Sequence, residues 1–132
     1  MKIDAHLWEA YSDPYFDFYR IPVSNNYAII TGWNRYGKLQ SYQDNQLQNN
    51  QLISAIPVIE PIKVDVGNRG FTWFEESYAV ELSMCSAREL GVKFAQNAIY
   101  YVVDGELLLL ACVEDKVRII GPIKDRYCKR IT

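Results

Sequence analysis

The sequence predicts an α+β fold in which helices cover one antiparallel sheet. Two observations lead to this prediction. Segments with the two-residue period of strands alternate with segments whose apolar spacing fits a helix. From Tyr27 onward these segments follow the order strand, helix, strand, strand, helix, strand. The chain has 132 residues, which suits one domain with its own core, so we expect a single domain over 1–132.

The N-terminal part is expected to add a helix and a strand to this unit. Residues 3–11 carry one apolar stripe, and Pro14 ends the helix that the stripe predicts. Residues 15–23 are rich in aromatic side chains and predict a strand, which Pro22 assigns to a sheet edge. A stronger strand follows at 27–33.

A helix is predicted over 41–55, with Ser41 as its N-cap and Asp44 in its first turn. One face of this helix would carry Tyr42, Asn45, Asn49, Leu52, Ile53 and Ile56. Two asparagines therefore lie on the stripe that should pack against the sheet. A buried amide without hydrogen-bond partners costs about 1–3 kcal/mol. Asn45 and Asn49 are thus expected either to tie down a neighbouring loop or to line a polar pocket.

Two strands are predicted next, at 58–66 and 72–82, and Pro61 places the first at an edge or a bulge. The second strand alternates in side-chain direction. One face has Phe74, Glu76, Tyr78, Val80 and Leu82, and the opposite face has Glu75, Ser77, Ala79 and Glu81. Because the first face is mostly apolar, we expect Glu76 to point inward.

The second helix is predicted over 86–95, where Ser86 and Glu89 form a capping-box pattern; Ser83 is a rival N-cap. Its apolar residues are spaced for one short stripe.

A continuous apolar run at 98–103 predicts a well-buried strand. Asp104-Gly105 predicts a tight hairpin turn. The return strand is expected at 106–113, and a last short strand at 117–120.

The order β-α-β-β-α-β is the ferredoxin-like pattern, with two helices on one face of an antiparallel sheet. The N-terminal helix and strand and the C-terminal hairpin would extend it. In this topology 27–33 is central and 98–103 lies antiparallel beside it. We therefore expect Trp33 and Asn34 to lie near Gln96 and Asn97.

Composition excludes several classes of function. The net charge is −2 and no long basic run occurs, so nucleic-acid binding is not expected. No segment reaches the roughly 18 apolar residues of a membrane span, and no secretory signal is visible. Three cysteines without a C-x-x-C motif and one histidine argue against a metal site. No cofactor motif is present. The expected compartment is the reducing cytoplasm.

The segments AIITGWNRYG, EES (75–77) and LGVKFAQNAI, together with the Asn45/Asn49 pair, resemble the bacterial domain of unknown function 3293 family over about 27–103. The resemblance implies a small, cytosolic, single-domain bacterial protein with no assigned activity. The matching positions are Trp33, Asn34, Asn45, Asn49, Glu76, Ser77, Gln96, Asn97 and Ala98. The chain departs from the family pattern at Arg35, where proline is usual, and at Ala95, where glycine is usual.

The favoured hypothesis is a non-catalytic binding or interaction domain with an amide-rich site. The candidate binding residues are Trp33, Arg35, Ser77, Glu76 and the amides Asn34, Asn45, Asn49, Gln96 and Asn97. Amides recognise polar groups well but transfer protons poorly. Such a site suits a small polar ligand or a protein partner, as in a regulatory partner-binder or an immunity protein. An edge strand at 15–23 or 58–66 could also pair in a dimer.

Two alternatives stay open. A small hydrolase-like enzyme could use Glu76 as its general base, because burial raises a carboxyl pKa. No base, nucleophile pair or metal cluster accompanies Glu76, which favours the non-catalytic reading. Alternatively, the polar positions are purely structural and pin loops to the sheet.

Overall fold

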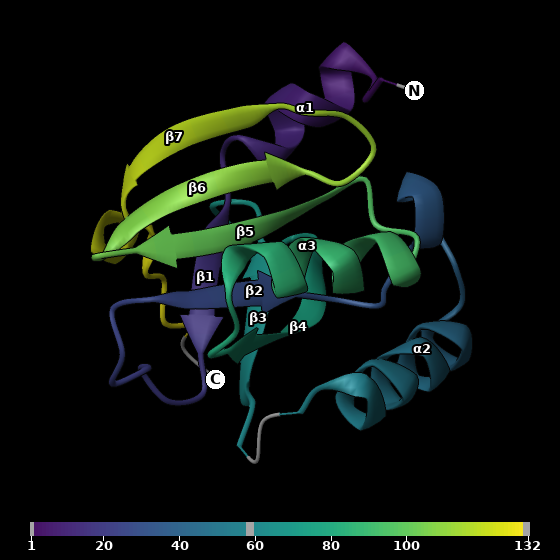
Figure 1. Cartoon of the computed structure of the whole chain (residues 1–132), viewed down its shortest axis with the longest axis horizontal. Helices are drawn as coiled ribbons and strands as arrows, with labels where there is room; N and C mark the ends of the chain where they lie inside the picture. The colour runs from purple at the N-terminus through teal and green to yellow at the C-terminus, as the bar shows by residue number, and fades with distance from the viewer. Residues whose placement is uncertain (1, 58–59, 131–132) are drawn as a thin grey trace.

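The computed structural model in Figure 1 describes residues 2–57 and 60–130. In these residues the helices are α1 (Ala5–Tyr11), α2 (Tyr42–Ala55) and α3 (Met84–Lys93), with short 3-10 helices η1 (Arg35–Gly37) and η2 (Ile123–Arg126). The strands are β1 (Tyr15–Phe18), β2 (Tyr27–Ile30), β3 (Ile62–Gly67), β4 (Phe74–Val80), β5 (Ala98–Val103), β6 (Glu106–Ala111) and β7 (Val117–Pro122). They form one curled sheet in the order β1-β3-β4-β2-β5-β6-β7.

The α+β prediction is confirmed, and every neighbouring pair in the sheet is antiparallel. The expected pairing of the central strand is also present, because β2 lies between β4 and β5. The predicted edge position of 58–66 is wrong: β3 is an interior strand, since β1 pairs outside it. Residues 58–59 of that prediction lie outside the described residues.

Element boundaries differ most where polar residues or prolines follow a strand. The strand expected at 15–23 ends at Phe18, before Pro22, and that expected at 27–33 ends at Ile30. The helix expected over 86–95 is α3, and it begins earlier, at Met84. Ser83 is its N-cap, and the Ser83 Oγ accepts the Ser86 N–H at 3.1 Å. The helix therefore starts at the Ser83 cap and not at the Ser86–Glu89 capping box.

Helices α2 and α3 lie on one face of the sheet; in Figure 1 α3 crosses in front of β2, and α2 lies below and to the right of it. Buried apolar residues join this layer: Ala28 and Ile30 from β2, Leu52 and Ile56 from the α2 end, Ala87 and Phe94 from α3, and Ile99 and Tyr101 from β5. Helix α1 packs on the opposite face, where Trp8 meets Leu109 and Ala111 of β6.

The sheet curls around a second core on that opposite face. Its members include Phe16, Phe18, Ile29, Val64, Val66, Val102 and Leu107. The chain after η2 returns to β1, since Tyr127 bridges Phe16 and the Cys128 N–H donates to the Phe16 carbonyl at 2.9 Å. The two edges of the sheet therefore approach each other and partly enclose its inner face.

Candidate functional site

The asparagines of α2 hold the loop between β2 and α2. Asn49 Oδ1 accepts the Gly32 N–H at 2.7 Å, and its Nδ2 donates to the Glu76 backbone carbonyl at 2.9 Å. Asn45 Oδ1 accepts the Asn34 N–H at 2.9 Å. Both side chains are almost completely buried. Of the two predicted roles for these amides, their hydrogen bonds correspond to tying down a loop.

Replacing Asn49 with alanine is expected to lower the free energy of unfolding by about 2 kcal/mol, because the Gly32 N–H and the Glu76 carbonyl lose their partner. Chemical denaturation measures this loss. Asn50→Ala on the exposed side of the same helix is the matched control and should change stability by less than about 0.5 kcal/mol. Equal effects of the two substitutions would contradict the pinning role.

The loop after β2 and the turn before β5 both contain residues with strained backbone conformations. Asn34, Tyr36 and Ala95 all have positive φ, at 50°, 58° and 57°, a region that residues with a Cβ rarely occupy. The Tyr36 N–H donates to the Ala95 carbonyl at 2.7 Å, and Gln96 Nε2 donates to the Trp33 carbonyl at 3.0 Å. The turn before β5 and the loop after β2 therefore hold each other in unfavourable conformations, as is common near functional sites.

Ala95→Gly is expected to stabilise the protein by about 1 kcal/mol, because glycine occupies the left-handed region without the Cβ cost. A thermal melt that shows a higher Tm checks this. Ala87→Gly, inside helix α3, should instead lower the Tm. A lower Tm for Ala95→Gly would contradict the strain at this position.

A cavity of about 600 Å³ lies beneath this loop on the inner face of the sheet. Its walls come from the end of α1, the loop after β2, the β3–β4 turn and the start of β5; they include Leu7, Tyr11, Thr31, Asn34, Leu39, Val66, Trp73, Glu75, Ser77, Gln96, Asn97, Ala98 and Tyr100. Leu39 and Trp73 are 85% and 48% exposed, so they mark the mouth. Cavities of this size suit small organic ligands.

Glu75 is the one acid of the cavity lining that has no ion-pair partner among the described residues. It pairs across the sheet with Val66, and Ser77 pairs with Val64, so both side chains share the inner face with these valines. Glu75 Oε2 accepts a hydrogen bond from Asn34 Nδ2 at 2.8 Å. Burial raises the pKa of the Glu75 carboxyl to about 7, and the Asn34 hydrogen bond opposes this only in part. Glu75 can therefore change its protonation near neutral pH.

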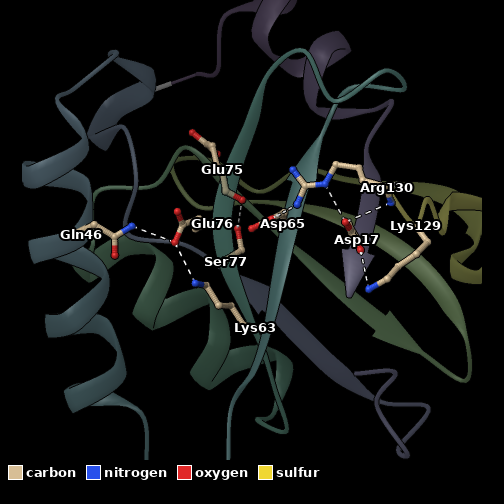
Figure 2. A network of polar contacts seen from close by, with 9 residues as sticks. All are labelled: Asp17, Gln46, Lys63, Asp65, Glu75, Glu76, Ser77, Lys129 and Arg130. Carbon is tan, nitrogen blue, oxygen red and sulfur yellow. Dashed lines mark hydrogen bonds and ion pairs between the residues drawn. The ribbon is translucent and has the colours of Figure 1, made fainter. Parts of the chain in front are cut away.

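Glu76 lies on the other face of β4, toward α2. Figure 2 shows it directed at Gln46 and Lys63, while Glu75 points away from that pair. Glu76 Oε1 is 3.0 Å from Gln46 Nε2 and 3.3 Å from Lys63 Nζ. A carboxylate that is paired in this way and turned from the cavity has no access to a ligand there.

Glu76 also belongs to a row of acids across three strands. Asp17 of β1 pairs with Asp65 of β3, and Asp65 pairs with Glu76 of β4. Like charges directly opposite each other destabilise a sheet. Three cations balance the row: Arg130, which bonds to both Asp17 and Asp65, Lys129 at Asp17, and Lys63 at Glu76 (Figure 2).

The structure divides the predicted site residues into two groups. Asn34, Ser77, Gln96 and Asn97 line the cavity, with Ala98 beside them. Asn45, Asn49 and Glu76 lie on the α2 side of the sheet. Trp33 is buried, its ring 5.9 Å from that of Tyr42, and Arg35 is exposed. Asn34 connects the groups, because it bonds to both Asn45 and Glu75.

Three cavity residues were not among the site residues predicted from the sequence: Glu75, Tyr11 and Tyr100. Asn97 Nδ2 donates to Tyr11 Oη at 3.3 Å, and Tyr100 Oη donates to the Tyr11 carbonyl at 2.5 Å. Strand alternation had already placed Glu75 beside Ser77, a signal that could have been followed. Tyr11 gave no such signal, because its position depends on where α1 docks.

Within residues 2–57 and 60–130, no three His, Cys, Asp or Glu side chains are grouped as ligands for a metal ion. Among the helices that the structure describes, none has the length and apolarity needed to cross a membrane.

In a comparison with protein families, the family described as "Protein of unknown function (DUF3293)" matches residues 30–99. This segment runs from the end of β2 to the start of β5. It contains the pinned loop, α2, Glu75 and the amides before β5. Comparisons with curated proteins and with solved structures give no match.

Proposed function

Because the chain belongs to the DUF3293 family, whose function is not known, we propose from the geometry that it is a non-catalytic protein that binds a small organic ligand. The ligand would occupy the cavity beneath the loop after β2. The observation that carries this proposal is a cavity of about 600 Å³ with a partly buried carboxyl of raised pKa in its wall.

The lining supports binding more than chemistry. It is mostly apolar and aromatic, with a few amides and hydroxyls, the usual composition of a ligand site. The loop over it is fixed by Asn45 and Asn49 and kept at positive φ. A site that is held rigid before its ligand arrives loses less entropy on binding.

A fragment screen by thermal shift and ligand-observed NMR tests the proposal. Fragments should raise the Tm of the wild type, and Ala98→Phe should remove the effect by filling the cavity. Ala5→Phe adds the same bulk at an exposed position of α1 outside the lining and should leave binding intact. If no fragment binds, or if Ala98→Phe binds equally well, the proposal fails. A reproducible protein partner would then favour the regulatory or immunity-type role that the amide-rich site first indicated.

A second candidate function is a small hydrolase-like enzyme, and one observation favours Glu75 over Glu76 as its general base. The pKa of Glu75 is raised to about 7, which suits proton transfer at neutral pH. A panel of activated esters would test this reading. Glu75→Gln should abolish any turnover, and Glu76→Gln should retain it. The opposite result would return the role to Glu76.

We also propose a ferredoxin-like topology for the core and a cytoplasmic location for the protein. The order β3-β4-β2-β5, with α2 and α3 on one face, supports a ferredoxin-like core within the larger sheet. Cys85, Cys112 and Cys128 are free thiols, which supports a reducing, cytoplasmic setting. Small-angle scattering with and without reductant tests this setting. The proposal predicts the same particle size in both, and a larger, disulfide-linked species without reductant would contradict it.

A further inference from the structure

We infer that the cavity takes a small organic cation, an amine carried on an apolar or aromatic body, whose protonated nitrogen pairs with Glu75. This inference rests on the proposed function and adds the chemical class of the ligand. Three features of the lining carry it: its charges, its hydrogen-bond donors and its aromatic rings.

The charges of the lining are all negative among the described residues. Glu9, Asp13 and Glu75 line the cavity, and no Lys, Arg or His does. Two of these acids already have a cationic partner: Glu9 Oε1 is 2.9 Å from Arg118 Nη1, and Asp13 pairs with Arg126. Glu75 has no cationic partner in the part of the chain that the structure describes. A buried carboxylate without a counter-charge is costly, and a cationic ligand would supply that charge.

Most side-chain donors of the lining are already engaged inside the protein; the exceptions among the described residues are the Tyr11 hydroxyl and the Trp73 indole N–H. Gln96 Nε2 donates to the Trp33 and Phe94 carbonyls, Asn34 Nδ2 to Glu75 and Asn97 Nδ2 to Tyr11. The hydroxyls of Thr31, Ser77 and Tyr100 donate to backbone carbonyls. Among the described residues, Glu75 Oε1, Gln96 Oε1 and Asn97 Oδ1 have no donor. The site therefore offers mainly acceptors, and its best complement is a ligand that donates.

Aromatic rings complete the match. Tyr11 and Tyr100 lie in the wall and Trp73 at the mouth. Burial raises the pKa of both tyrosines, so they stay neutral and Glu75 is the group that ionises near pH 7. Neutral aromatic faces bind cations and stack on flat apolar bodies.

Isothermal titration at pH 8 with three indole compounds tests the inference. Tryptamine is cationic, indole-3-ethanol is neutral and indole-3-propionate is anionic, and the three share one aromatic body. The wild type should bind tryptamine about tenfold more tightly than the alcohol, the expected worth of a charge-assisted hydrogen bond. The acid should bind most weakly. Glu75→Gln should remove the preference for tryptamine, and Glu81→Gln, at an exposed position, should keep it.

Each contrary result has a distinct meaning. Equal or tighter binding of the alcohol or the acid would overturn the cation inference but leave the cavity a binding site. An undiminished tryptamine preference in Glu75→Gln would overturn the role of that carboxyl. If the wild type binds none of the three compounds, the inference also fails, and the fragment screen alone then decides the proposed function. Circular dichroism of Glu75→Gln verifies that the variant is folded.

Discussion

Replacing Arg130 with alanine is expected to lower the free energy of unfolding by about 4 kcal/mol, as for other broken buried ion pairs. Arg130 Nε is 2.8 Å from Asp17 Oδ2, and its terminal nitrogen bonds to Asp65. Both aspartates are buried and directly opposite each other on β1 and β3. Burial raises the pKa of Asp65 even with Arg130 beside it. Without the guanidinium, Asp65 would lose its ion-pair partner, and Asp17 would keep only the exposed Lys129.

Arg130 also joins the C-terminal segment to the β3–β4 turn. Its guanidinium lies 4.8 Å from the Phe71 ring centre and 4.7 Å from that of Phe74. Phe71 has a positive φ of 51°, so this contact stabilises a strained residue.

Chemical denaturation of Arg130→Ala measures the loss, with Lys129→Ala as the matched control. Lys129 is 78% exposed and 3.6 Å from Asp17, so its loss should cost less than about 1 kcal/mol. Arg130→Lys should be intermediate, because one ammonium cannot reproduce the fork between two aspartates. Similar costs for the two alanine variants would contradict the role of Arg130 as the central cation.

The second large effect is a pH dependence of stability that comes from Glu75. Its pKa rises from the ordinary 4.5 to about 7 in the native protein. Between these values the native state binds more protons than the unfolded chain, so the free energy of unfolding falls as pH rises. The full difference is about 3 kcal/mol. Below pH 4.5 the ionisation of Glu75 does not lower the free energy of unfolding, and above pH 7 the full loss is present.

Glu75→Gln should therefore be more stable than the wild type by about 3 kcal/mol at pH 8, relative to the same comparison at pH 4. The glutamine oxygen can still accept the hydrogen bond from Asn34. Urea denaturation across this range gives the difference, and Glu81→Gln, which removes an exposed carboxyl, should show no such change. A wild type that gains stability as pH rises from 5 to 7, relative to Glu75→Gln, would contradict the buried carboxyl.

Local patterns predicted the elements well, because each depends on neighbouring residues. The run Ala98–Val103 became β5 without change, and Ser41 caps α2, its Oγ accepting the Asp44 N–H at 3.1 Å. The start of α3 was wrong because Ser83 and Ser86 offer similar caps. The place of β3 was wrong because its outer neighbour, β1, comes from a distant part of the chain.

The cavity could not be predicted, because it depends on the curl of the sheet and the docking of α1. Tyr11 reaches Asn97 only through that docking. The sequence placed Glu76 inward, and it does face α2, but there it pairs with Lys63 and accepts a hydrogen bond from Gln46. Glu75, one residue earlier, faces a cavity that no local pattern reveals. A carboxyl acquires its chemistry from the elements around it more than from the strand that carries it.

The central claim is that Glu75 is a partly buried carboxyl in the wall of a preformed cavity. The most direct measurement is its pKa, followed by the chemical shift of its side-chain carboxyl carbon in a ¹³C NMR titration, with Glu75→Gln used to assign the signal. We predict a midpoint of about 7 in the ligand-free protein. A midpoint near the ordinary 4.5 of glutamate would mean that the carboxyl is solvated, and would contradict both the cavity and the function proposed for it.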